Sequence, residues 1–238
     1  MKVAVMTDVH GNLPALEAAL NVIQTEKCDY IYHTGDAIGI GPFPLECLEL
    51  SLKNNVRMIM GNHEEYYAFG IPNPKPSYMS DGELEHQLWV SSILGPKYKK
   101  IVALFPYTIN ECFLDFNVVF SHYAFKPGMN EFTEIEKSPN KEMMDQMFAE
   151  VDTDLIFYGH NHSFSDIAGR RRYVNPGSLG CSSDIALSRF VIIDFHKGSY
   201  ELRHFSIPYD DNCLFSALEE RQVPDRDMIR NIFFRRAL

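Results

Sequence analysis

A regular alternation of apolar and amphipathic segments over residues 1–60 restricts the fold of this chain more than any other feature. Short runs rich in β-branched residues alternate with segments whose apolar residues recur at helical spacing. The pattern predicts, in order, strand Lys2–Met6, helix Pro14–Gln24, strand Tyr30–Thr34, helix Pro44–Lys53 and strand Val56–Met60. Because strand–helix–strand units join parallel strands through right-handed crossovers, we expect a parallel sheet here.

The second half of the chain is richer in strands. Strands are predicted over Thr108–Asp115, Asn117–Ser121, Leu155–Tyr158, Arg172–Val174, Phe190–Phe195 and Tyr200–Ser206. Helices are predicted over Lys141–Ala149, Asp211–Arg221 and Asp225–Phe234. This order favours an α/β (α+β) fold in which two packed sheets carry helices on their outer faces.

We expect a single domain over residues 1–238, because no repeat and no long linker divides the chain. Residues 70–82 are rich in Pro and Gly and predict a loop, which a helix near Leu84–Leu94 follows. The region around residues 70–100 is therefore a possible helical insert that acts as a lid over a site.

Composition and charge limit the function. Hydrophobic residues make up 45% and charged residues 23%, which is typical of a folded globular chain and excludes a disordered one. Lys and Arg number 22 against 32 Asp and Glu, and the resulting charge of −10 argues against broad binding to nucleic acids or acidic membranes. No signal peptide or membrane-spanning stretch is predicted, so we expect a cytoplasmic protein. The five widely spaced cysteines predict reduced, mostly buried thiols rather than disulfides.

Five short polar segments each follow an apolar, strand-like run. They are Asp8-Val9-His10-Gly11-Asn12, Gly35-Asp36, Gly61-Asn62-His63-Glu64, Ser121-His122 and Gly159-His160-Asn161-His162. Ligands of open α/β sheets bind outside the carboxyl ends of the strands, where these segments are expected. Asp8 and His10 are two residues apart, as are His160 and His162. In extended backbone this spacing places both side chains of a pair on one side.

Each polar segment alone has two interpretations. An isolated Asp-x-His is more often structural, since aspartates cap helices and histidines fill satisfied core positions. Together, however, the segments hold five of the nine histidines, and four of these stand beside a glycine or an acidic or amide partner. Independent structural causes for all five segments are difficult to find. Asp, Asn and His donors without cysteine suit Mn²⁺, Fe, Zn²⁺ or Ni²⁺, so the set predicts a metal site.

The ordered set Asp-x-His, Gly-Asp, Gly-Asn-His-Glu, His and Gly-His-x-His resembles the signature of the calcineurin-like metallophosphoesterases. The phrases TDVHGN, HTGDAIGIGPFP, MGNHE, YGHNHS and VNPGS are similar to the compact prokaryotic phosphodiesterase branch, and the resemblance runs from Met1 to about Ser206. Glu64 departs from the Asp more frequent in this branch, and His122 stands in Ser-His-Tyr rather than His-Gly. The resemblance implies a four-layer αββα sandwich of two mixed β-sheets flanked by helices.

The resemblance also implies the role of each residue in the five segments. A first metal ion would be held by Asp8, His10, Asp36 and His162, and a second by Asp36, Asn62, His122 and His160. The two ions, with Mn and/or Fe favoured and Zn or Ni possible, would share a bridging hydroxide that attacks phosphorus. His63 would be catalytic, either as a general acid or as a positively polarised group on the phosphate.

The implied activity is hydrolysis of small phosphodiesters and/or nucleotide phosphoanhydrides, such as nucleoside or diadenosine polyphosphates. A phosphomonoesterase is the alternative within the enzyme class, and a non-catalytic binding scaffold with the same fold is the alternative outside it. The complete ligand set argues against the scaffold, and the charge of −10 argues against a nuclease on long DNA. We expect a small, nucleotide-like phosphorylated substrate, no stable nucleic acid partner, no membrane, and a possible homodimer.

Four further residues are candidate supporting or substrate contacts. Asn12 would position a ligand or a water, Tyr123 would stack on a base, and Asn175 would lie near the metals. Arg171, within Arg170–Arg172, would reach the outer phosphates of a nucleotide, although a solvated hairpin turn is the favoured interpretation of this run. A solvated face is also predicted for Arg230, Arg235 and Arg236.

Overall fold

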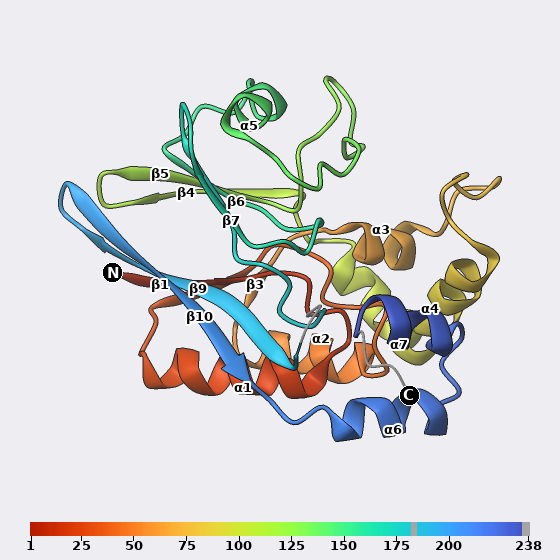
Figure 1. Cartoon of the computed structure of the whole chain (residues 1–238). Coiled ribbons are helices and arrows are strands. Elements are labelled where there is room, and N and C mark those ends of the chain that lie inside the picture. The colour runs from red at the N-terminus through yellow and green to blue at the C-terminus, as the bar shows by residue number, and fades with distance from the viewer. Residues whose placement is uncertain (182–184, 235–238) are drawn as a thin grey trace.

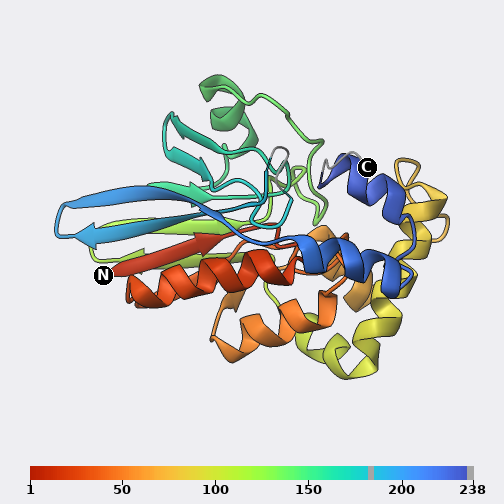
Figure 2. The same ribbon diagram turned by 60° about the horizontal axis from the view of Figure 1, so that its bottom comes forward.

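Two β-sheets packed face to face form the centre of the computed structural model, which describes residues 1–181 and 185–234 (Figure 1). Helices lie on the outer face of each sheet, so four layers are stacked in the order helix, sheet, sheet, helix (Figure 2). This arrangement confirms the predicted αββα sandwich. Arg235 and Arg236, predicted to face solvent, lie outside the described residues.

The first sheet has the strand order β10-β9-β1-β2-β3. Strand β1 (Lys2–Met6) pairs in parallel with β2 (Tyr30–His33), which pairs in parallel with β3 (Arg57–Met58). Strand β9 (Leu187–His196) returns antiparallel to β1 and forms a long hairpin with β10 (Ser199–Pro208). The predicted parallel core is confirmed, and the late hairpin makes the sheet mixed.

The second sheet has the strand order β4-β5-β6-β8-β7. Strands β5 (Phe116–Ser121), β6 (Leu155–Phe157) and β8 (Arg172–Asn175) run parallel. The edge strands β4 (Thr108–Phe113) and β7 (Ser165–Ala168) are antiparallel to their neighbours. Both sheets are therefore parallel at the centre and antiparallel towards an edge.

The helices fall into two groups. Helices α1 (Leu13–Thr25) and α2 (Pro44–Lys53) cover the first sheet, and α5 (Lys141–Met147) covers the second (Figure 1). The remaining helices gather beyond the end of the molecule towards which β1 runs (Figure 1); they are α3 (Asn62–Phe69), α4 (Asp81–Val102), α6 (Asn212–Glu220) and α7 (Arg226–Ile232).

Strand β1 shows how the sequence builds the layers. Val3 and Val5 face the second sheet, while Ala4 and Met6 face the helical layer, and all four are fully buried. A strand buried on both faces has a continuous apolar sequence, which is the pattern that predicted it. Between the sheets, the ring of Phe120 stacks on Tyr32 with a centroid distance of 3.9 Å.

Helix α3 and strand β7 were missed by the predictions, and helix α4 is longer than predicted. Helix α3 was not predicted: it buries His63, Glu64 and Tyr67, so hydrophobic periodicity is absent from its sequence. Strand β7 was also missed, since it is short and alternates weakly. Helix α4 extends beyond the predicted end to Val102, with a non-helical residue at Gly95 before a proline.

In residues 1–181 and 185–234, no helix is both long enough and apolar enough to cross a membrane. All five cysteines are free, which agrees with the prediction of reduced thiols. Cys112 and Cys213 are nevertheless exposed, because they lie on an edge strand and on an outer helix.

We predict that Phe120→Ala lowers the free energy of unfolding by about 3–5 kcal/mol, because it opens a cavity between the two sheets where Phe120 contacts both Tyr32 and Phe157. Urea denaturation measures the change. Leu104→Ala, at a side chain that is 82% exposed, is the control and is expected to change stability by less than about 0.5 kcal/mol. Equal effects of the two substitutions would contradict this description of the core.

Candidate metal centre

The five polar segments meet at one end of the sandwich. Asp8 follows β1, Asp36 follows β2, His122 follows β5 and His160 follows β6. Asn62 lies beyond β3 and is the first residue of α3. Because these strands are parallel and the sheets are packed together, their carboxyl ends bring the segments together, as the sequence predicted.

One group of donor atoms surrounds His10. Its Nε2 lies 2.8 Å from Nε2 of His162, and both nitrogens lie 3.7 Å from Oδ1 of Asp8. Oδ2 of Asp36 is 3.9 Å from the same His10 nitrogen. Two imidazoles and two carboxylates therefore converge within the reach of a single ion.

A second group of donor atoms surrounds His122. Its Nε2 lies 3.2 Å from Oδ2 of Asp36, 3.2 Å from Oδ1 of Asn62 and 3.0 Å from Nδ1 of His160. Asp36 thus belongs to both groups. The structure brings together all seven residues predicted as metal ligands: Asp8, His10, Asp36, Asn62, His122, His160 and His162.

The backbone of these residues differs from the predicted extended form. Asp8 and His10 have φ values of +52° and +48°, and His160 and His162 have φ values of +70° and +57°. The explanation by alternation along a strand is therefore wrong, although the paired side chains do converge. Asp36, at φ +60°, shares this left-handed conformation. Such residues cost of order 1–3 kcal/mol each and concentrate at functional sites.

The protonation of the cluster follows from burial and from its charges. Burial lowers the pKa of His160 to about 3 and that of His162 to about 4. Burial would raise the pKa of Asp36, but His122 and His63 hold it well below its usual range. Burial would lower the pKa of His122, but attraction to Asp36 outweighs it and raises this pKa to about 9. At neutral pH the cluster therefore holds ionised Asp36 beside His122, and the neutral imidazoles of His160 and His162 each keep one unprotonated ring nitrogen.

These residues fit the binding of two transition-metal ions. Imidazole nitrogens and carboxylate or amide oxygens are donors suited to Mn, Fe, Zn or Ni. His122 uses Nδ1 to bond the carbonyl of Thr34 at 2.8 Å, which directs its Nε2 towards Asp36. Such an outer hydrogen bond is the usual means of fixing a ligating imidazole.

Glu64 holds the loop that carries Asp36. Its buried carboxylate accepts four backbone N–H bonds, from Asp36 at 2.7 Å, Ala37 at 2.9 Å, Ile38 at 3.2 Å and Gly61 at 3.0 Å. These donors satisfy both oxygens. Glu64 thus ties the β2 loop to the start of α3 without joining the donor groups.

His63 lies against the first group of donors. Its backbone N–H donates to Oδ1 of Asp36 at 3.0 Å, and its ring centroid is 5.0 Å from that of His10. Gln87, from α4, bonds its Nδ1 at 2.7 Å. A Cβ added at Gly39 would overlap this Nδ1, so only glycine leaves room for the ring.

Cys181 is a nearby donor that the sequence analysis missed. Its sulfur and the ring nitrogens of His10 and His162 all lie within 4.8 Å of one another. The cysteine is 171 residues from His10 in the chain (181 − 10), so no local spacing motif joins it to the ligands.

Three of the four supporting candidates are buried near the centre, but each is used by the protein itself. Asn12 caps α1 and donates to the carbonyl of Gly180. Asn175 donates to the carbonyl of Gly159 at 3.1 Å and so supports the His160 loop. Tyr123 is 1% exposed and packs on His160 with a centroid distance of 5.2 Å, so it offers no open face to a base.

Arg171 does not reach the donor groups. It immediately precedes β8, at the end of the second sheet opposite to the carboxyl ends. Arg172 pairs with Asp166 of β7 at 2.8 Å across a tight hairpin. The arginine run is therefore the hairpin turn that the sequence favoured, and the alternative of a phosphate contact is wrong because of where this turn lies.

The family of this chain is known from the proteins that it resembles. The model of the calcineurin-like phosphoesterases matches residues 1–225 of this chain. The chain belongs to this family. An uncharacterized protein of Methanocaldococcus jannaschii is 25% identical, with 94% of each chain covered. A symmetrical bis(5'-nucleosyl)-tetraphosphatase of Psychromonas ingrahamii is 37% identical over 67 residues, which are only 27% of this chain and 24% of that protein.

A solved structure of this fold is the hypothetical protein PH1004 of Pyrococcus horikoshii OT3. It superposes with a TM-score of 0.83 at 19% identity and covers 100% of this chain and 99% of its own. This likeness confirms the calcineurin-like sandwich. Family membership makes phosphoester hydrolysis with divalent metal ions the general chemistry of the chain.

We predict that Glu64→Gln lowers stability by about 2–4 kcal/mol, because the new amide NH₂ would face backbone N–H donors that now have an acceptor. Thermal and urea unfolding measure the change. Glu85→Gln, at an exposed position of α4, makes the same chemical change and is expected to be neutral. A neutral result for Glu64→Gln would contradict its role as the anchor of the loop.

We also predict that Gly39→Ala lowers turnover more than tenfold while metal content is retained, because the methyl group displaces the His63 ring. Gly198→Ala is the matched control: Gly198 also has a positive φ of +73°, but its Cβ would meet nothing within 4 Å. Metal analysis and steady-state kinetics on both variants separate displacement of His63 from backbone strain. Equal turnover in the two variants would contradict the prediction.

Proposed function

We propose that this protein is a dinuclear-metal phosphoesterase that hydrolyses small phosphodiesters and/or nucleotide phosphoanhydrides. The observation that carries the proposal is the position of Asp36, whose Oδ2 is 3.9 Å from His10 Nε2 in one donor group and 3.2 Å from His122 Nε2 in the other. A carboxylate shared by two sets of ligands is what two neighbouring cations require.

In this proposal the first ion is held by Asp8, His10, Asp36 and His162, and the second by Asp36, Asn62, His122 and His160. Mn and/or Fe are favoured, and Zn or Ni is possible. When bound, the pair of ions supplies Lewis acidity, which lowers the pKa of water and offsets the charge of the phosphate.

His63 is the proposed proton donor to the leaving oxygen. The hydrogen bond between the Gln87 side-chain amide and Nδ1 fixes the ring, so Nε2 is the nitrogen that can exchange a proton with a substrate. Glu83 lies close enough to this ring for their charges to interact. Burial raises the pKa of Glu83, and the positive charge of a protonated His63 lowers it. Proton transfer by a positioned group contributes typically 10²–10⁴-fold to a rate.

The substrate is proposed to be small and nucleotide-like. The chain charge of −10 opposes long nucleic acids, whereas two divalent cations would make the site locally attractive to a phosphate. Local similarity to a bis(5'-nucleosyl)-tetraphosphatase over 67 residues supports a nucleotide. Organisation as one domain, a lid around residues 70–100, a cytoplasmic location and a homodimer stay predictions.

We predict that Asp36→Asn abolishes metal binding and activity together, since it weakens both ligand sets. His63→Ala is expected to retain two ions per chain and to lower kcat by about 10²–10⁴. Metal analysis and a Mn²⁺-supplemented screen with a phosphodiester, a phosphomonoester, ATP and diadenosine tetraphosphate measure both effects.

His196→Ala, at a histidine whose side chain is 59% exposed, is the control and is expected to match the unmodified protein. Normal turnover in His63→Ala would overturn its catalytic role. Normal metal content in Asp36→Asn would overturn the shared-ligand proposal.

A further inference from the structure

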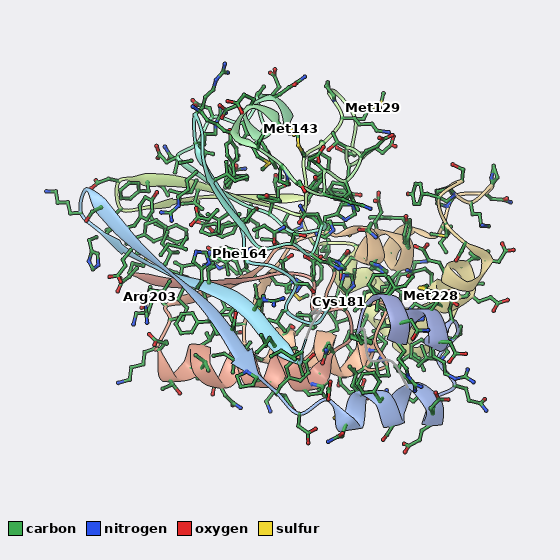
Figure 3. The ribbon with its side chains drawn as sticks, viewed as in Figure 1. Met129, Met143, Phe164, Cys181, Arg203 and Met228 are labelled. Carbon is green, nitrogen blue, oxygen red and sulfur yellow. The ribbon has the colours of Figure 1, made fainter. Side chains whose placement is uncertain are left out.

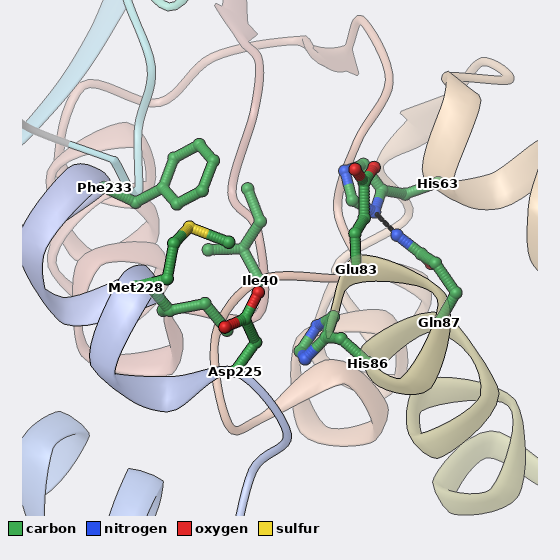
Figure 4. Close-up of a pocket in the computed structure, with 9 residues that line it drawn as sticks. Ile40, His63, Glu83, His86, Gln87, Asp225, Met228 and Phe233 are labelled. Atoms are coloured by element: carbon green, nitrogen blue, oxygen red, sulfur yellow. Dashed lines mark hydrogen bonds between the residues drawn. The ribbon is translucent and has the colours of Figure 1, made fainter. Parts of the chain in front are cut away.

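A cavity of about 110 Å³ opens beside His63, between α4 and α7 (Figure 4). Its apolar side is formed by Ile40, Met228 and Phe233, and Glu83, His86 and Gln87 from α4 line its polar side. A volume of this size holds several water molecules or one ring system, but not a whole nucleotide. None of the seven predicted metal ligands lines it.

We infer that this cavity receives one ring of the leaving group of the substrate, and that this leaving group is a neutral, ring-bearing alcohol such as a nucleoside, whose base would occupy the cavity. The inference rests on the proposed function, because it takes His63 as the proton donor. A leaving group that takes a proton from His63 must lie next to the His63 ring. His63 lines this cavity, so a leaving group in the cavity meets that requirement.

His86 provides an unused polar surface in the cavity. It is 3% exposed, and the carbonyl of Pro224 is the one backbone group that acts on its ring as a hydrogen-bond acceptor. With the N–H of His86 directed at this carbonyl, the other ring nitrogen has no partner among the described residues. Buried polar atoms normally have partners, so this nitrogen is a site for a donor on the edge of a ligand, such as the amino group of a heterocycle.

The charges around the cavity select against an anionic leaving group. Glu83 and Asp225 both line it, and no Lys or Arg is among the residues of its lining. A leaving group that still carries phosphates, such as ADP departing from ATP, would meet these acidic side chains without a basic partner, whereas an uncharged nucleoside would not be opposed in this way.

The reaction balances with water alone. The oxygen of water forms the new bond to phosphorus, and the bond between phosphorus and the alcohol oxygen breaks. The alcohol oxygen takes a proton from Nε2 of His63, so a neutral alcohol remains in the cavity. A proton released from the attacking water restores His63.

Met228→Trp tests the inference, because it fills the cavity from α7. Met143→Trp on α5 is the matched control, and both positions are labelled in Figure 3. The substrates are adenosine 5'-monophosphate and methyl phosphate, or the methyl diesters of the two if the unmodified protein prefers diesters. We expect Met228→Trp to lower the ratio of kcat/KM for the adenosine ester over the methyl ester at least tenfold, and Met143→Trp to leave this ratio unchanged.

A binding measurement that does not depend on turnover accompanies the kinetics. Calorimetric titration with adenosine is expected to detect binding to the unmodified protein that is weakened at least tenfold by Met228→Trp and by His86→Phe. The second variant keeps a planar aromatic ring at this position and removes its nitrogens. Asp225→Asn is expected to raise kcat/KM for ATP relative to adenosine 5'-monophosphate at least threefold.

The outcomes separate the two proposals. An unchanged ester ratio in Met228→Trp, or adenosine binding that neither Met228→Trp nor His86→Phe weakens, overturns the leaving-group cavity while the phosphoesterase proposal stands. Absence of hydrolysis of every ester by the fully metal-loaded, unmodified protein overturns the proposed function, and the leaving-group role with it.

Discussion

The attraction between the buried carboxylate of Asp36 and the imidazole of His122 is the interaction on which the rest of the site depends. Their atoms are 3.2 Å apart, and both side chains are almost fully excluded from water. Burying an isolated charge is costly, so each group stabilises the charged form of the other. A cation placed between the donor groups would take over this role and displace the proton of His122.

The fold of the sandwich places Asp36 and His122 close together. The parallel strands of both sheets end at the same end of the molecule. Side chains that are far apart in the sequence therefore meet there: Nε2 of His162 lies 3.7 Å from Oδ1 of Asp8. The loops there adopt left-handed conformations at five of the seven ligand positions. The apolar layers on both sides of each sheet, and the four hydrogen bonds to Glu64, hold these loops in strained conformations.

Much of the fold and of the donor set could be predicted from the sequence, because both depend on local patterns. Apolar runs indicated the central strands, and the polar residues that end them indicated the ligands. The rest depends on contacts between distant segments. Helix α3 buries polar groups, so its sequence has no apolar periodicity from which it could be predicted. Cys181 is distant from His10 in the sequence and comes near it only in the folded chain. The cavity beside His63 needs α4 and α7 to meet, which no local pattern contains.

The proposed sharing of Asp36 by two metal ions is tested most directly by anomalous X-ray diffraction from crystals of the Mn²⁺-loaded protein. We expect two anomalous peaks per chain, roughly 3.5–4 Å apart, with the Asp36 carboxylate between them. A single peak, or two peaks of which only one contacts Asp36, would contradict it.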